Sequence, residues 1–291
     1  MAAFIASQRE AHGVPYAVSC RALGVSQSWF YKWKDGRLPA RAVRRERLKA
    51  ETARLFSERE GKEGAPRVAA ALREDGWRVS ENTVAALMRQ MGLAARRKKK
   101  RKASTRPGRG RWRAPDLVKR KFAADGINRR WYGDGTEVKT GEGKLYLDSV
   151  LDVGSRRILG FALGAHRDAA LAYGALAMAV AVRGGAVPGV VFHTDQGSEY
   201  TARAFRAACE RLGVAQPVGR PGSALDNAVT GSWYSTLESG LRSLHQFATR
   251  AQARPVVAAW IEDCNTVRRH SALGMRSPVA YEQALKGKDS L

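Results

Sequence analysis

Residues 131–163, WYGDGTEVKTGEGKLYLDSVLDVGSRRILGFAL, decide the fold of the larger part of this 291-residue chain. Branched and aromatic residues alternate with other types in three runs, and turn signals separate the runs at 140–143 and 154–156. This pattern is typical of three consecutive strands joined by short turns. One carboxylate, Asp134, stands inside the first run between two glycines.

The segments that follow alternate between helical and extended patterns. In order, they predict an apolar helix (168–185), a buried strand (189–195), an amphipathic helix (201–213), a short strand (214–218) and a further helix (228–244). Three strands, helix, strand, helix, strand, helix is an α/β order with a mixed sheet.

Two aspartates occupy positions that suit metal-ion chemistry. Asp134 lies in the first strand, and Asp195 ends the strand VVFHTD, where it would open onto the ligand crevice of the sheet. The order of elements predicts that these strands are neighbours. Paired carboxylates suit Mg²⁺, and two bridged ions can hold both oxygens of a phosphoryl transfer. Either aspartate alone also fits a turn or a helix cap, and His193 either orients a carboxylate or fills space.

The basic excess lies almost wholly in the first half of the chain. Residues 1–130 hold 33 basic and 12 acidic side chains, whereas residues 131–291 hold 18 and 15, for a formal total of +24. A polyanion bound by the first half is the simplest interpretation. A solvated basic face or RNA contact is the alternative.

Hydropathy, the first residues and the cysteines limit where the protein is expected to be located and to which class it belongs. No apolar run is long enough to span a bilayer, and the first residues do not have the pattern of a signal peptide. Cys20, Cys209 and Cys264 show neither zinc-site nor disulfide spacing. We therefore expect a cytoplasmic protein with no membrane partner; the family resemblance described below further implies that it is bacterial and nucleoid-associated.

Two helical modules are predicted ahead of the strands, at 1–45 and 46–95. In the first, Gly24 breaks a short helix and Ser26 can cap the next, SQSWFYKWKDG, whose basic and aromatic side chains suit a groove. A plain helical hairpin with aromatic core residues fits about equally. In the second, Ser80 can cap a helix whose apolar residues Val84, Leu87 and Met88 share one face.

A basic linker is predicted at 96–122. Its first part, 96–113, holds eleven basic residues and no acidic ones, so it cannot form a core and is expected to follow DNA phosphates. A solubilising tether is the alternative. The candidate contacts here are Arg96, Arg97, Lys98, Lys99, Lys100, Arg101 and Lys102.

From about Asn128 to Glu282 the chain resembles the IS3 family of insertion-sequence transposases, which are relatives of retroviral integrases. The matching blocks are WYGDGTEV, GKLYLDSVLD, SRRILGFAL, FHTDQGSEYT, SALDNAV, SWYSTLE and NTVRRHSALGMRSPVAYE. The resemblance implies a ribonuclease H-like, mixed-sheet catalytic core at 123–245 with a C-terminal helical part at 246–291, preceded by the all-α helix-turn-helix modules. It also implies two Mg²⁺ (or Mn²⁺) ions held by an Asp, Asp, Glu triad, with double-stranded element ends and target DNA bound by a homo-oligomer.

By this resemblance Asp134 is the first catalytic carboxylate and Asp195 the second. The family places its Glu after 35 intervening residues, just beyond a D-N-A motif, and here that position holds Gly231. The expected outcome is an inactive chain. Glu238, on the same predicted helix, and Glu199 and Asp226, in nearby loops, are the acids that would have to substitute.

The C-terminal block contributes Arg268, Arg269 and His270, for which phosphate contact and a structural surface helix are both open. The hypothesis for the whole chain is a transposase that cleaves element ends and joins them to target DNA. Its main rival is a non-catalytic DNA-binding or repressor protein derived from a transposase, supported by Gly231. A nuclease or resolvase acting on branched DNA and a transcription regulator explain fewer of the motifs.

The charge of the first half generates a prediction. Residues 1–122 are expected to bind duplex DNA with an affinity that falls steeply with salt, because binding releases counterions. Neutralising Lys98 to Lys102 should weaken binding to all sequences alike, since phosphate contacts carry no base information. Titration of labelled duplexes at several salt concentrations tests both points. Equal affinity at low and high salt, or loss on one sequence alone, would contradict them.

Overall fold

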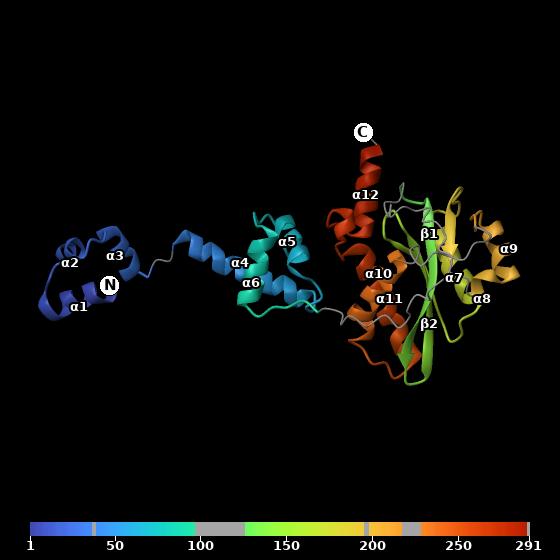
Figure 1. Cartoon of the computed structure of the whole chain (residues 1–291), viewed down its shortest axis with the longest axis horizontal. Helices are drawn as coiled ribbons and strands as arrows, with labels where there is room; N and C mark the ends of the chain where they lie inside the picture. The colour runs from blue at the N-terminus through green and yellow to red at the C-terminus, as the bar shows by residue number, and fades with distance from the viewer. Residues whose placement is uncertain (37–38, 97–125, 195–197, 217–227, 290–291) are drawn as a thin grey trace, which may run out of the picture. The chain divides into compact units, whose positions relative to one another are not determined.

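The computed structural model describes residues 1–36, 39–96, 126–194, 198–216 and 228–289 (Figure 1). The chain divides into two compact units, Met1–Ala95 and Arg96–Leu291, and each has its own apolar core. No helix among the described residues combines the length and the apolar character needed to cross a membrane.

The second unit is built on a four-stranded sheet in the order β3-β2-β1-β4. The strands are β1 (Arg130–Thr140), β2 (Gly143–Asp152), β3 (Ile158–Gly164) and β4 (Val191–Thr194). Strand β1 pairs antiparallel with β2 and parallel with β4, so the predicted mixed sheet is confirmed. The strand predicted at 214–218 is represented, within the described residues, by one parallel bridge between Ala215 and Val191.

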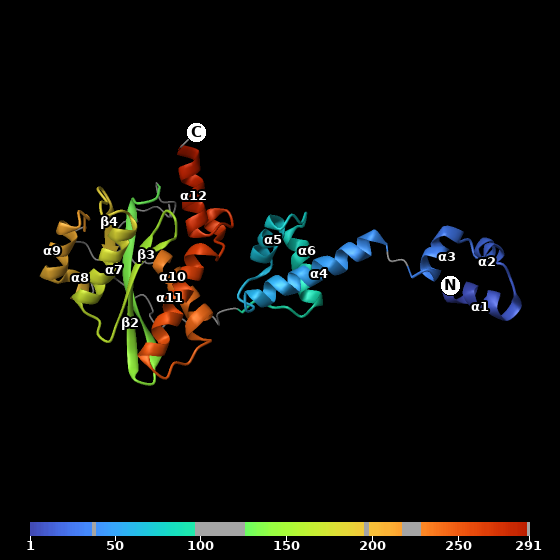
Figure 2. The same ribbon diagram turned by 180° about the vertical axis from the view of Figure 1, so that it is seen from behind.

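Helices cover both faces of this sheet, as the two opposite views show (Figure 2). On one face lie α7 (Ala169–Val182), α8 (Ser198–Thr201) and α9 (Arg203–Arg211), with a core that includes Trp131 and Phe192. On the other lie α10 (Ala228–Leu237) and α11 (Arg250–Thr266), packed on Leu145 and Leu147. The chain ends in a short 3₁₀ turn, Ser271–Leu273, and α12 (Pro278–Asp289). Both faces are covered because β2 carries apolar residues on each of them, with Val150 in one core and Leu145 and Leu147 in the other.

One helix differs from its prediction. The helix expected over 228–244 is α-helical only to Leu237 and continues as a π-helix, η1, at Glu238–Arg242. A Cβ at Gly240 would lie 3.1 Å from the indole nitrogen of Trp260, so this turn packs closely against α11. Close packing of this kind is a tertiary effect that helical periodicity does not reveal.

The first unit contains two three-helix clusters. The first comprises α1 (Ala2–His12), α2 (Tyr16–Ala22) and α3 (Gln27–Lys34), around Ile5, Cys20 and Phe30. The predicted Gly24 break has φ +66°, and the Ser26 hydroxyl accepts from the Trp29 amide at 3.1 Å, as expected of a cap. Helix α1 was not predicted.

The second cluster comprises α4 (Ala40–Glu58), α5 (Ala65–Glu74) and α6 (Glu81–Gln90). Val84, Leu87 and Met88 are buried in its core as predicted, and the Ser80 hydroxyl caps α6 by accepting from the Thr83 amide at 3.1 Å. Helix α4 is continuous across residues 45 and 46, so a module boundary at that point would cut a helix. Of the predicted linker, only Arg96 is described, and it is exposed.

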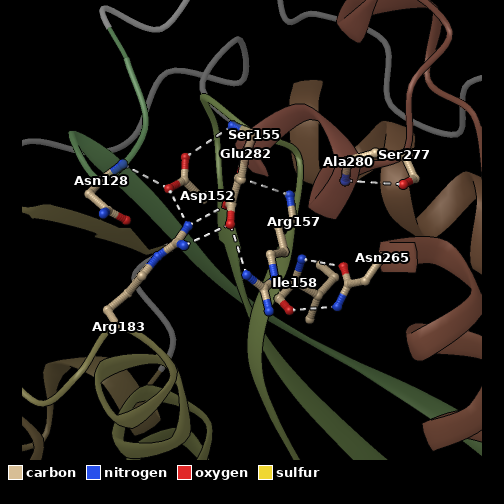
Figure 3. Close-up of polar contacts among 10 residues, drawn as sticks. All are labelled: Asn128, Asp152, Ser155, Arg157, Ile158, Arg183, Asn265, Ser277, Ala280 and Glu282. Carbon is tan, nitrogen blue, oxygen red and sulfur yellow. Dashed lines mark hydrogen bonds and ion pairs between the residues drawn. The ribbon is translucent and has the colours of Figure 1, made fainter. Parts of the chain in front are cut away.

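A buried ion cluster joins α12 to the sheet and to the end of α7 (Figure 3). Arg183, just after α7, donates to Glu282 of α12 at 2.5 and 2.9 Å and to Asp152 of β2 at 3.2 Å. Arg157 donates to the same Glu282 carboxylate at 2.8 Å. The Asp152 carboxylate also accepts from the Asn128 amide at 2.8 Å. The C-terminal helix is therefore anchored by charge-assisted bonds inside the protein.

Substitution of Glu282 should show how much this cluster contributes to the free energy of unfolding. Glu282→Ala is expected to lower the free energy of unfolding by about 3 kcal/mol, because Arg183 stays buried with Asp152 as its remaining acidic partner and loses both of its bonds to Glu282, while Arg157 loses its bond to the same carboxylate. Glu238→Ala, which removes a more exposed pair with Arg242, is the control and should cost about 0.5 kcal/mol. Urea denaturation at pH 7 measures both. Equal losses would contradict the assignment.

The pH dependence of the cluster has a definite sign. Burial by itself raises the pKa of Glu282, but hydrogen bonds from Arg183, Ser155 and Arg157 outweigh it and lower the pKa from 4.5 to about 2. The stabilisation is complete above the unfolded-state pKa and is lost as pH falls toward 2. The stability gap between the native chain and Glu282→Gln should therefore shrink between pH 5 and pH 2. A gap that stays constant over that range would exclude this account.

Candidate active site

Asp134 lies in the middle of the sheet, on β1 opposite Ser149 of β2, with a half-buried side chain. Its Oδ1 accepts from the Gly135 amide at 2.8 Å. A Cβ at Gly133 would lie 2.3 Å from Cζ of Phe192, and one at Gly135 would lie 3.2 Å from the guanidinium of Arg167. The two glycines that flank Asp134 are thus explained by neighbours that occupy the space of a side chain.

The parallel pairing of β1 with β4 brings the two predicted catalytic segments together. Its register sets Arg130 opposite Val191 and ends with Gly133 opposite Thr194. These last two residues immediately precede Asp134 and Asp195 in the sequence. Asp195 itself lies outside the described residues.

A tyrosine from α10 holds the backbone of β1 at Asp134. The buried Tyr234 hydroxyl donates to the Asp134 carbonyl and lies 3.2 Å from the Ser149 hydroxyl. Burial, and then the negative charge of Asp134, raise the pKa of Tyr234 well above 10, so it is a neutral donor. The sequence analysis did not single out Tyr234, because only the fold brings α10 to this strand.

A further carboxylate, Asp148, lies on β2, but its side chain leaves the opposite face of the sheet from that of Asp134, because the partner of Asp134 in the register is Ser149. Asp148 is opposite Gly135 in the antiparallel register and is almost fully buried. The Tyr200 hydroxyl donates to it, and burial followed by the Asp148 charge raises the pKa of that tyrosine well above 10. Asp148 is thus a buried acid held by Tyr200, on the other face of the sheet from Asp134.

Two of the three acids proposed as substitutes for the missing Glu form ion pairs with arginines. Glu199 is buried and forms an ion pair with Arg167 at 2.6 Å. Glu238 pairs with Arg242 at 3.0 Å at the start of the π-helical turn. Asp226 lies outside the described residues.

Gly231 is exposed on α10, and a Cβ built there meets no atom within 4 Å. It precedes Tyr234 by three residues, and residues three apart on a helix are neighbours on one face. The position of the expected third acid is therefore one turn from the side chain that touches the Asp134 backbone. Among the described residues, no atom blocks the first carbon of a side chain at this position.

The remaining predicted residues are His193, the block Arg268, Arg269 and His270, and the linker residues. His193 stacks on Tyr132, with ring centroids 5.2 Å apart, which favours its space-filling role. Arg268, Arg269 and His270 are half-buried just after α11, and His270 forms a backbone bridge with Arg276. The linker residues 97–102 lie outside the described part of the chain.

The described residues can be tested for their fit to a divalent cation. Among them, no three His, Cys, Asp or Glu side chains gather as a metal-binding group. Asp134 nevertheless offers a half-buried, hard oxygen ligand of the kind Mg²⁺ prefers, next to the segment that leads into Asp195. These residues fit part of a metal site.

Comparison with known proteins finds both family models and solved structures that resemble this chain. Models described as "Integrase core domain" match residues 124–224 and 212–278, and one described as "HTH-like domain" matches residues 43–101. A solved structure of the HTLV-2 integrase catalytic core domain in complex with magnesium is 14% identical, with TM-score 0.42, over 54% of this chain and 98% of that one.

Relatives match over most of the chain. The transposase for insertion sequence element IS904 of Lactococcus lactis is 35% identical, covering 83% of this chain and 95% of that protein. The 31 kDa protein of insertion element IS600 from Shigella sonnei is 34% identical, covering 91% and 97%. Transposase InsF for insertion sequence IS3A of Escherichia coli is 32% identical, covering 94% and 96%. With a ribonuclease H-like integrase core, an HTH-like domain and these relatives, the chain belongs to the IS3 family of insertion-sequence DNA transposases.

Proposed function

We propose that this transposase binds the ends of its insertion sequence as duplex DNA and that Asp134 and Asp195 are its first two catalytic carboxylates. The observation that carries the assignment is the parallel register of β1 and β4, which sets Gly133 opposite Thr194, the residues that immediately precede the two aspartates. In the proposed division of the chain, the helical clusters and the basic linker hold DNA and the ribonuclease H-like core carries the reaction. Assembly as a homo-oligomer on DNA is part of the same proposal.

In this proposal the residues of the chain position the Asp134 carboxylate and supply the negative charge that would hold the metal ions. Asp134 is held from two sides, by the Gly135 amide on its carboxylate and by Tyr234 on its carbonyl. Mg²⁺ or Mn²⁺ held by Asp134 and Asp195 would neutralise charge on the phosphate during transfer. In the first step an oxygen of water bonds to phosphorus and the P–O3′ bond breaks. In the second, the freed 3′-hydroxyl attacks a target phosphate, and one strand is exchanged for another.

Gly231 supports a second candidate, a transposase-derived protein that occupies DNA ends without cutting them. The position expected to carry the third acid has no side chain, and Glu199 and Glu238 are both committed to arginines. With one acid missing from a set that acts as a unit, most of the activity is expected to be lost.

Metal binding tests the first two carboxylates independently of catalysis. The chain should bind Mn²⁺ weakly, and Asp134→Asn or Asp195→Asn should each reduce the binding at least tenfold. Electron paramagnetic resonance titration of free Mn²⁺ measures this directly. Glu262→Gln, an exposed acid on α11, is the matched control and should leave binding unchanged. Full Mn²⁺ binding in both aspartate variants would refute the assignment.

The third acid is tested by Gly231→Glu. We expect the native chain to give little or no cleavage and joining of a labelled element-end duplex in Mg²⁺, and Gly231→Glu to restore both. Glutamate also favours a helix over glycine, by roughly 0.5 to 1 kcal/mol, so the variant should fold at least as well. Gly231→Gln is the control that adds the same length without charge, and it should stay inactive.

Two outcomes would contradict this account. Robust activity of the native chain would show that another acid completes the site. Inactivity of Gly231→Glu with DNA binding intact would favour the non-catalytic candidate.

A further inference from the structure

The peptide group between Asp134 and Gly135 makes both contacts that orient the proposed first catalytic carboxylate. Its carbonyl accepts from the Tyr234 hydroxyl, and its N–H donates to Oδ1 of Asp134 at 2.8 Å. A glycine rotates about its backbone bonds more freely than other residues, because it has no Cβ. The orientation of this peptide group, and with it that of the Asp134 carboxylate, therefore depends on what packs against Gly135.

Arg167 covers Gly135 on the face of the sheet opposite the Asp134 side chain. A Cβ at Gly135 would leave that face, since successive side chains alternate along a strand, and it would lie 3.2 Å from the guanidinium. Nε of Arg167 donates to the Glu199 carboxylate at 2.6 Å, and the Glu199 side chain is only 5% exposed. This charge-assisted bond to a buried carboxylate fixes the guanidinium over Gly135.

Asp148 lies beside Gly135, on the same face of the sheet as Arg167. It is the direct partner of Gly135 in the register of β1 and β2. Directly opposed residues of two such strands have Cβ positions about 5 Å apart. The Asp148 carboxylate accepts from the Tyr200 hydroxyl, and both residues are 1% exposed. Gly135 is thus bounded by a guanidinium over it and a carboxylate next to it, and each of these groups is held by a buried partner.

The two buried partners, Glu199 and Tyr200, are consecutive residues of one helical turn, α8. This turn has anchors of its own. The Gln216 side chain donates to the Tyr200 carbonyl at 3.1 Å, and the Tyr200 ring packs edge-on against Phe205, with ring centroids 5.5 Å apart. A single anchored turn therefore fixes both groups that bound Gly135.

The positive charge of Arg167 shows that packing, and not attraction of a metal ion, explains its place. A guanidinium near a site for a divalent cation repels that cation, so charge alone gives no reason for Arg167 to lie next to Gly135. The Glu199 carboxylate offsets this charge through the ion pair at 2.6 Å. What remains is the contact of a planar, hydrogen-bonded group with the backbone of β1.

We propose that Glu199 and Tyr200 are positioning residues, which act through Arg167 and Asp148 to hold Gly135 and so aim the Asp134 carboxylate at a divalent cation. The inference rests on the proposed function only for the assignment of Asp134 as a metal ligand. Groups that orient a metal ligand without touching the metal change metal affinity by about ten- to hundredfold when they are removed. This assignment gives Glu199 a role other than that of a substitute catalytic acid.

The first measurement follows the Gly135 amide in the full, metal-free chain. Its hydrogen exchange is recorded by NMR with isotope-labelled glycine, for the native chain, Tyr200→Phe and Arg167→Gln. Tyr200→Phe removes only the hydroxyl that donates to Asp148, and Arg167→Gln removes the guanidinium over Gly135. Each substitution should speed the exchange of Gly135 by about tenfold or more, because local opening of the restrained amide becomes easier.

The second measurement is the Mn²⁺ affinity of the same variants, by electron paramagnetic resonance titration. Both should bind Mn²⁺ at least about fivefold more weakly than the native chain. Arg167→Gln gives the sharper result. Loss of a nearby positive charge would by itself strengthen cation binding, whereas loss of positioning weakens it.

Three variants separate positioning from other effects. Tyr173→Phe removes the hydroxyl of an exposed tyrosine on α7 and should change neither measurement. Glu282→Gln weakens the ion cluster at α12, and it should lower the unfolding temperature while leaving Gly135 exchange and Mn²⁺ affinity unchanged. Asp134→Asn should reduce Mn²⁺ binding by at least about tenfold.

Unchanged exchange of Gly135 in either Tyr200→Phe or Arg167→Gln would overturn the inference, whatever the chain does with Mn²⁺. Unchanged Mn²⁺ affinity in Tyr200→Phe, or a raised affinity in Arg167→Gln, would also overturn it. The proposed function would still stand in that case if Asp134→Asn loses its Mn²⁺ binding. Full Mn²⁺ binding in Asp134→Asn would instead overturn the assignment of Asp134, and with it the aiming of that carboxylate at a cation.

Discussion

The pairing of β1 with a neighbour on each side is the constraint on which the catalytic unit depends. β1 is central in the described sheet, antiparallel to β2 and parallel to β4, and the second pairing is what carries the chain from Asp134 to the segment that ends in Asp195. Gly133 makes the close approach possible, because Phe192 occupies the space where its side chain would be. A larger residue at 133 would push β4 away and separate the two segments.

Buried polar groups then hold the elements that surround this strand. On one side Tyr234 ties α10 to the Asp134 carbonyl, and at the end of β2 Asp152, Arg183 and Glu282 tie α12 to the sheet. A buried polar group is costly unless its partner is in place, so these bonds allow few alternative arrangements. The catalytic strand and the C-terminal block are in this way parts of one rigid body. This shared packing explains why the C-terminal family motif occurs together with the catalytic acids, although the two are far apart in the sequence.

The helical first unit differs from the catalytic unit in its small cores and its polar, arginine-rich surface. Its clusters have small apolar cores and leave most polar side chains at the surface, and arginines are held there by backbone carbonyls and by Gln90. Such surfaces suit a partner that supplies the opposite charge. The acidic residues are shared between residues 1–130 and 131–291, with 12 and 15 respectively, whereas the excess of basic residues lies in residues 1–130.

The sequence by itself determined the order of elements, the mixed sheet, the caps at Ser26 and Ser80 and the family, because periodicity, turn chemistry and motif spacing are local properties. It also pointed to Asp134 and to the absence of an acid at Gly231. Only the tertiary structure decided that Tyr234 holds the Asp134 carbonyl, that Glu199 and Glu238 are held by arginines, and that the predicted helix becomes a π-helix at Glu238. Each of these depends on contacts between residues distant along the chain, and no local pattern records which strand a helix will meet.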